Sequence, residues 1–186
     1  MPLTQSNFNP NQQSNGQAPQ EKTNFKIGKS LRGTDGTVQF SLWKSKNNAL
    51  YTSIQLRQMI GKDPNGRVNY EGGLAKDIPS VLLHADRASS LYSIFKNTPP
   101  DQINHVDKQE EYNTEFYVKG SPAGVTLTIT NKLGTRTVTL PSIATGNVNS
   151  FGVWENFLRL MSVCINKCIM NDASEEVPGE DGSTPF

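Results

Sequence analysis

Runs of alternating apolar and polar residues, each followed by a helical pattern, occur twice along this chain, and this order limits the folds open to it. In residues 37–44, Val38, Phe40 and Leu42 alternate with polar side chains. Period-two alternation is typical of a strand with one buried face. Similar runs occur at 25–32 and 50–57, and residues 78–83 are predicted to be a fourth, more buried strand. Apolar residues at helical spacing follow, with Asp86 as the expected cap, so the first half is predicted to be four strands and then a helix.

The second half repeats this order after a polar linker predicted at residues 99–111. Strands are predicted at 115–119, 125–130 and 135–140, and a long amphipathic helix at 150–170. The apolar stripe of this helix comprises Phe151, Trp154, Leu158, Met161, Ile165 and Ile169. Each sheet can bury its apolar face under the helix that follows it. The predicted fold class is therefore α+β, built of two antiparallel-sheet-plus-helix halves; the alternative is a five-stranded OB barrel with an added C-terminal helix.

Both ends of the chain differ in composition from the part between them. Residues 1–23 are rich in Gln, Asn, Pro and Ser and are predicted to be a disordered arm. Residues 171–186 form a predicted disordered acidic tail with five acids and a terminal Pro185-Phe186. All 18 Lys and Arg lie between Lys22 and Lys167, against 11 acids, so this stretch carries +7. The predicted domain, residues 24–170, is thus basic, which favours a polyanionic partner.

Two aromatic residues are predicted on the polar face of the first sheet, where water would otherwise contact them. The strand phase places Trp43 and Tyr51 on that face. Such rings among cations suit single-stranded nucleic acid, whose bases stack and whose phosphates bind Lys and Arg; packing under a loop or in a subunit interface is the alternative. The predicted contacts in the first half are Lys26, Arg32, Gln39, Ser41, Trp43, Lys44, Lys46, Tyr51, Ser53, Gln55 and Arg57. Tyr117 and Lys119 are predicted to extend the face.

No catalytic, metal or cofactor site is predicted. His84 and His105 have no metal-ligand spacing, and His84 is expected to have a structural role near the helix start. Cys164 and Cys168, four residues apart on the apolar helix, are expected to pack in the core. The first residues lack the features of a signal peptide, no apolar run reaches membrane length, and two cysteines fit a reducing compartment, so we expect a cytoplasmic protein.

The end of the chain resembles the C-terminal tip of bacterial and phage single-stranded DNA-binding proteins, in which acids precede Pro-Phe or Phe. The matching residues are Asp172, Glu175, Glu176, Glu180, Asp181, Pro185 and Phe186. This resemblance implies that the tail recruits replication or recombination proteins. A free carboxylate beside an exposed ring would suit a basic pocket with an apolar floor.

The body resembles the Whirly and positive-cofactor-four families of single-stranded nucleic-acid-binding proteins. The likeness lies in the doubled order, in the strand at 78–83 that runs into a helix at Asp86, and in Gly36-Thr37-Val38, which opens a strand ending at Trp43. Together with the tail, this resemblance implies a phage- or bacterium-type protein that coats single strands during replication, recombination or repair. The broad apolar surface of the second helix predicts a homo-oligomer. Two alternatives remain. A structural or virion-assembly protein would not bind oligonucleotides. An RNA-binding regulator would share this surface, and the sequence does not distinguish it because contacts to the 2′-hydroxyl cannot be recognised there.

Overall fold

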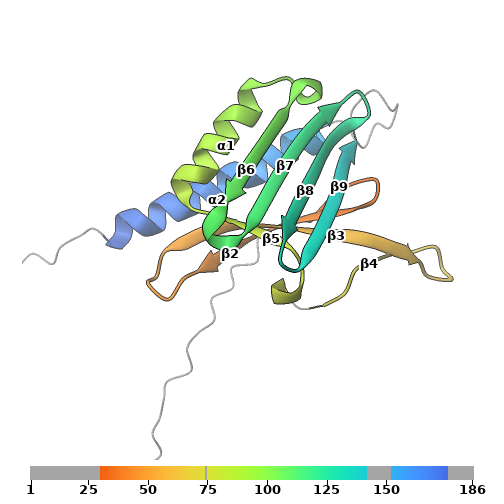
Figure 1. The fold of residues 1–186 in the computed structure, drawn as a ribbon, viewed down its shortest axis with the longest axis horizontal. Coiled ribbons are helices and arrows are strands. Elements are labelled where there is room, and N and C mark those ends of the chain that lie inside the picture. The colour runs from red at the N-terminus through yellow and green to blue at the C-terminus, as the bar shows by residue number, and fades with distance from the viewer. Residues whose placement is uncertain (1–29, 74, 142–151, 176–186) are drawn as a thin grey trace, which may run out of the picture.

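The protein folds into two antiparallel sheets and two helices, in the order strands, helix, strands, helix (Figure 1). The computed structural model describes residues 30–73, 75–141 and 152–175. The predicted arm at residues 1–23, Lys26 and Phe151 lie outside these ranges. The α+β class with two sheet-plus-helix halves is confirmed. The sheets do not close into a barrel, so the OB alternative is wrong.

The first sheet has five strands, with the central strand β3 paired to three neighbours. Its order is β1-β2-β3-β4, and β5 also pairs with β3, every pair being antiparallel. The strands are β1 (Ser30–Arg32), β2 (Gly36–Lys44), β3 (Leu50–Lys62), β4 (Val68–Tyr70) and β5 (Ser80–Leu83). Strand β3 continues to Lys62, five residues beyond the predicted run at 50–57, and the chain turns back through Asp63 into β4. Asp63 Oδ1 accepts the backbone N–H groups of Asn65 and Arg67 at 2.9 and 2.8 Å.

Helix α1 (Ala85–Asn97) follows β5, and its start differs from the prediction. The N-cap is His84, whose extended backbone leaves the strand, and its side chain makes no capping hydrogen bond. Asp86 lies inside the first turn, so the prediction that it caps the helix is wrong. A carboxylate there still interacts favourably with the positive end of the helix dipole.

The second sheet is a four-stranded meander in the order β6-β7-β8-β9. Its strands are β6 (Asn104–Gln109), β7 (Thr114–Ser121), β8 (Gly124–Asn131) and β9 (Gly134–Pro141). The predicted linker at 99–111 is therefore wrong, because it contains β6. The two side chains that β6 buries, Asp107 and Gln109, are both polar, so no apolar alternation marks this strand in the sequence. The Arg87 Nε donates to Asp107 Oδ1 at 2.7 Å, and the Gln109 Nε2 donates to the Leu82 carbonyl at 2.9 Å, whereas the buried Gln109 Oε1 has no hydrogen-bond partner among the described residues.

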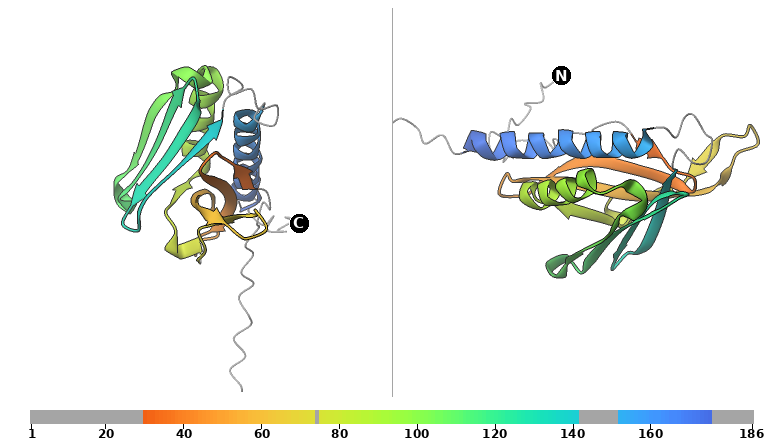
Figure 2. Two further views of the ribbon diagram at one scale, coloured as in Figure 1. Left: turned by 90° about the vertical axis from the view of Figure 1, so that its right-hand side faces the viewer. Right: turned by 90° about the horizontal axis from the view of Figure 1, so that it is seen from above.

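Helix α2 (Val153–Glu175) belongs to the second half of the sequence but packs on the first sheet. The Phe157 ring meets the Phe40 ring of β2 edge-on at 5.2 Å and stacks on Trp154 at 4.9 Å. Helix α1 contacts both α2 and the first sheet, and it lies between α2 and the second sheet (Figure 2). The expectation that each helix covers the sheet preceding it is thus wrong for α2. One continuous core joins both halves.

The buried stripe of α2 also differs in part from the predicted stripe. Trp154, Leu158, Met161 and Ile165 are buried as expected, whereas Ile169 is exposed. Other residues complete the buried side, namely Phe157, Cys164 and Cys168. The helix also continues five residues beyond its predicted end, into the start of the predicted tail. Within the described residues, neither helix combines the length and apolar character needed to cross a membrane.

Candidate nucleic-acid interface

The polar face of the first sheet carries three aromatic rings in a row, which come from β2, from β3 and from the residue after β5. The antiparallel register pairs Trp43 of β2 with Tyr51 of β3. Their ring centroids lie 5.6 Å apart at an interplanar angle of 64°. The ring of His84, which follows β5, lies 5.6 Å from Tyr51 at 73°. We call Trp43, Tyr51 and His84 the aromatic row.

His84 joins this row because of its place at the junction between β5 and α1. Thr52 pairs with Leu83, and Ser53 with Leu82, so the residue after β5 has the phase of Leu82 and falls beside Tyr51. From the sequence, His84 is expected to have a structural role near the helix start and not a place on this face. Counting phase one residue past the predicted strand end would have identified it.

The aromatic row is open to solvent and partly preorganised. Trp43 is 44% exposed, the His84 side chain is 47% exposed and Tyr51 is half-buried. Edge-to-face ring pairs contribute about 0.5–1.5 kcal/mol beyond burial, so each ring orients the next. A carboxylate also lies beside the row, since Asp86 Oδ2 is 3.9 Å from His84 Nδ1. This arrangement presents ring surfaces to water on a sheet that is otherwise polar.

Polar residues fill the middle of the face, but not all of them reach its surface. Ser41 pairs with Ser53, and Gln39 with Gln55, as the strand phase predicted. Ser41 and Gln39 are half-buried, whereas Ser53 and Gln55 are buried. Both buried residues lie in β3, where β2 on one side and β5 on the other shield them. Direct contact with a ligand therefore falls to the β2 side chains rather than to Ser53 and Gln55.

The predicted basic residues are divided between the ends of the sheet. Arg32 is exposed on β1 opposite Thr37, whose other neighbour is Arg57, so both arginines share the polar face. The Arg57 Nη1 donates to the Glu71 carbonyl at 3.0 Å. Lys44 has the phase of Leu42 and so belongs to the opposite face, which is a correction to the prediction. Lys46 is exposed in the turn between β2 and β3.

Tyr117 and Lys119 do not extend the aromatic row, because they lie on the second sheet. Both have the outward phase of β7, with Lys119 exposed and Tyr117 half-buried. The Tyr117 hydroxyl donates to Asn104 Oδ1 at 2.8 Å. Beside them, three cross-strand threonine pairs join β8 to β9 through hydroxyl contacts of 3.0–3.2 Å. Tyr117 and Lys119 thus form part of a separate polar face.

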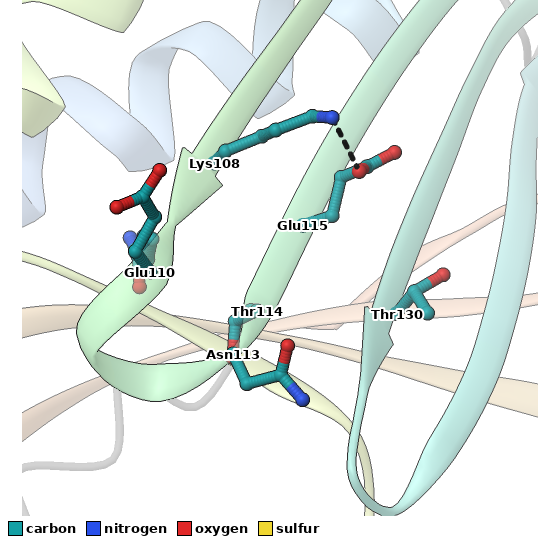
Figure 3. Close-up of a pocket in the computed structure, with 7 residues that line it drawn as sticks. Lys108, Glu110, Asn113, Thr114, Glu115 and Thr130 are labelled. Carbon is teal, nitrogen blue, oxygen red and sulfur yellow. Dashed lines mark ion pairs between the residues drawn. The ribbon is translucent and has the colours of Figure 1, made fainter.

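A shallow hollow of about 280 Å³ opens on the second sheet where β6 turns into β7 (Figure 3). The hollow is lined by Lys108, Gln109, Glu110, Asn113, Thr114, Glu115 and Thr130. The Lys108 Nζ lies 3.5 Å from Glu115 Oε2, so these charges offset each other across the hollow. The described residues contain no group of three or more His, Cys, Asp or Glu side chains that could hold a metal ion.

The two cysteines of α2 are buried, as predicted. Burial raises the pKa of the Cys164 thiol to about 12. Burial also raises the pKa of Cys168, while its contact with the Thr52 hydroxyl at 3.8 Å acts in the opposite direction. His105 is half-buried, with its ring 6.0 Å from Phe95. These thiols and this imidazole are packed in the body and do not join the aromatic row.

Most of the predicted tail lies outside the described residues. Asp172 and Glu175 are in the last turns of α2. The remaining tail residues, Glu176, Glu180, Asp181, Pro185 and Phe186, are beyond the described range.

Neither the known protein-family models nor the curated proteins include a match to this chain. The assignment of a ligand to the polar face therefore depends on its geometry and chemistry.

Proposed function

We propose that this protein binds single-stranded DNA without sequence preference through the polar face of its first sheet. The observation that supports this most is the aromatic row, in which successive ring centroids are 5.6 Å apart on a solvent-exposed sheet face. Exposing an aromatic ring to water costs free energy, whereas a base stacked on the ring covers it. Each base stacked on an aromatic side chain contributes roughly 1–3 kcal/mol to binding. Stacking needs no particular base, which explains why sequence preference is not expected.

The length and charge of the face suit a short stretch of strand. From Thr37 to Trp43, β2 is about 20 Å long at roughly 3.3 Å per residue, enough for a few extended nucleotides. Arg32 is exposed at the end away from the aromatic row, where its guanidinium group can pair with a phosphate. The Arg57 guanidinium at the same end already donates to the Glu71 carbonyl and to Gln55 Oε1. Lys46 lies in the turn near the row. The rings can stack on bases, and the cations at both ends can pair with phosphates of the same strand.

The wider role follows from the same hypothesis together with the sequence. A protein of this kind would coat and protect single strands during replication, recombination or repair in a cytoplasm, that of the host if a phage encodes it. The acidic tail would recruit partner proteins through Phe186, as its resemblance to single-stranded DNA-binding proteins implies. A self-associating protein without catalytic chemistry fits this role. The doubled sheet-and-helix order is also the arrangement that the resemblance to Whirly proteins implies.

Binding of fluorescent oligo-dT, followed by anisotropy at two salt concentrations, tests the proposal. We expect binding that is selective over the duplex, and Trp43→Ala with Tyr51→Ala should weaken it by about 30-fold or more, since two stacking contacts of about 1–3 kcal/mol are removed. Tyr112→Ala is the matched control, because Tyr112 is exposed on a turn outside the face. Undiminished binding in the double variant would move the site elsewhere, and absence of binding by the native protein would refute the function.

The contribution of His84 can be measured in the same assay. His84→Ala removes one ring from the end of the row and should weaken oligo-dT binding by about 5–150-fold, since one stacking contact of about 1–3 kcal/mol is lost. His84→Phe keeps a flat ring and should restore most of the affinity. If the Ala variant binds as tightly as the native protein, the row ends at Tyr51.

A further inference from the structure

A two-stranded arm projects from one end of the molecule. It comprises residues 58–71, the last part of β3 with β4, and Figure 1 shows it extending beyond the body. Its base is joined to the body, because the Met59 N–H donates to the Asp35 carbonyl at 2.8 Å. Arg136 of the second sheet also pairs with the Glu71 carboxylate. The arm is therefore a continuation of the first sheet that is held in place at its base.

The polar face of the first sheet continues onto this arm. Side chains two residues apart in a strand point to the same side, so Met59 has the phase of Arg57 and of Tyr51. Strand β4 places Tyr70 directly opposite Met59, and paired residues share a face. The β-bulge shifts the register only beyond this pair, between Met59 and Gly61. Met59 and Tyr70 therefore lie on the side of the sheet that carries the aromatic row.

Met59 and Tyr70 form a surface on which a base can stack, and we call them the arm pair. Met59 is 41% exposed, and Tyr70 is half-buried, as Tyr51 is in the aromatic row. A methionine thioether interacts favourably with an aromatic ring, so Met59 can support the ring of Tyr70 from the neighbouring strand. The arm pair thus repeats, at the far end of the face, the kind of surface that the aromatic row provides.

The charges of the arm favour a ligand recognised through the ring. Two acids, Asp63 and Glu71, balance Lys62 and Arg67, so the arm has no net charge. Stacking does not depend on charge, because every base presents a π-face to an aromatic side chain. A nucleobase is therefore the part of a DNA strand that fits the arm.

The distance between the two ring surfaces suits one strand laid along β3. Tyr51 and Met59 are eight residues apart in β3, which is about 26 Å at roughly 3.3 Å per residue. At a stacked rise of about 3.4 Å this length holds about eight nucleotides, or fewer in an extended strand. Arg32 lies between the two surfaces, since it aligns through Thr37 with Arg57, and its exposed guanidinium can pair with a phosphate.

We propose that the arm pair is a second base-stacking site, which binds a nucleotide several positions along the same strand from the aromatic row. This inference rests on the proposed function, because it extends the same polar face. One copy of the protein would then hold a strand at two points, with a phosphate contact between them. A strand long enough to reach both points should gain affinity from the ring of Tyr70.

Oligo-dT of two lengths tests this site in the full chain. At the stacked rise dT4 covers about 14 Å and occupies the aromatic row alone, whereas dT12 reaches both surfaces. Tyr70→Leu removes the flat ring but keeps an apolar side chain beside Met59. It should weaken dT12 binding by about 5–150-fold and leave dT4 binding nearly unchanged. Tyr70→Phe keeps the ring and should bind both like the native protein. Asn69→Ala is the matched control, because Asn69 is exposed on the other side of the same strand.

The salt dependence of dT12 binding separates stacking from phosphate contact. Tyr70→Leu should leave the slope of log affinity against log salt concentration unchanged, because no phosphate contact is lost. Arg32→Gln should make the same slope shallower by about 0.7, the value for one phosphate contact on a single strand. A change of slope in the Tyr70 variant would contradict recognition through the ring.

The outcomes distinguish this site from the proposed function. If dT12 binding depends on Trp43 and Tyr51 but Tyr70→Leu binds dT12 as tightly as the native protein, the function stands and the arm site is wrong. An equal loss for dT4 and dT12, or a Tyr70→Phe variant as weak as Tyr70→Leu, would also overturn the arm site, since Tyr70 would then act on the fold of the face. A native protein that binds neither oligonucleotide refutes the function and the arm site together.

Discussion

The pair formed by Glu71 and Arg136 should stabilise the protein measurably, because it connects the two sheets. Arg136 lies on β9, and Glu71 follows β4 at the base of the arm. The Arg136 Nε donates to Glu71 Oε2 at 2.8 Å, and its Nη2 donates to Oε1, so the guanidinium binds both carboxylate oxygens. Replacing Arg136 with Met removes this contact while keeping much of the side-chain volume.

The size of the effect follows from the exposure of the pair. The Arg136 and Glu71 side chains are 24% and 22% exposed, between the open surface and the core. Exposed pairs contribute up to about 1 kcal/mol, whereas breaking a fully buried pair costs about 3–5 kcal/mol. We expect Arg136→Met to cost about 2 kcal/mol. For a domain of this size that lowers the melting temperature by roughly 5–10 °C.

The pH dependence gives a second test of the same pair. The hydrogen bonds from Arg136 hold the pKa of Glu71 below its ordinary value, even though burial acts in the opposite direction. A lowered folded-state pKa means that the stabilisation is complete above the unfolded-state pKa, about 4.3, and is lost as the pH falls through the folded-state value. The stability difference between native protein and Glu71→Gln should therefore be largest near neutral pH and shrink below about pH 4.

Urea unfolding followed by circular dichroism measures these differences. Lys108→Met is the matched control, because its pair with Glu115 is longer, at 3.5 Å, and far more exposed. That variant should change the unfolding free energy by less than about 0.5 kcal/mol. Equal costs for the Arg136 and Lys108 variants, or a Glu71 effect that does not change with pH, would refute the reasoning.

Two further predictions concern packing. Gly120→Ala should destabilise the fold by more than about 3 kcal/mol, since a Cβ at this position would lie 1.9 Å from the Pro100 carbonyl oxygen. Gly72→Ala is the control and should be nearly neutral, because a Cβ there would have no atom within 4 Å. Thermal melts of the two variants measure the difference. Cys164 and Cys168 should resist a thiol reagent at pH 8 in the native protein and react fully in denaturant, because both are buried and their pKa values are raised. Rapid labelling of either thiol in the native state would contradict the packing of α2.

The sequence predicted the strands best where one side of the strand is apolar. Val38, Phe40 and Leu42 identify β2 and its buried side, and the same alternation placed Trp43 beside Tyr51 on the other side, as the register confirms. This worked because the side-chain period of a strand is two residues whatever the strand packs against.

Prediction from the sequence failed where the buried side chains are polar, or where a residue's position depends on contacts far along the chain. Strand β6 buries Asp107, which the Arg87 guanidinium on α1 satisfies, so no apolar pattern marks the strand. His84 entered the aromatic row because β5 pairs with β3, a contact between residues far apart in the chain. Ser53 has the predicted phase but is buried, since β3 is flanked on both sides.

By itself, the sequence determined the α+β class, the alternation of strand groups with helices and the faces of β2 and β3, because these depend on local periodicity. Only the tertiary structure decided that α2 would cover the sheet of the other half. The Phe157 ring fits against Phe40, and Cys168 lies against Thr52, through packing that depends on the shapes of both surfaces. An apolar stripe shows that a helix must be buried, but not which of two apolar sheets will bury it.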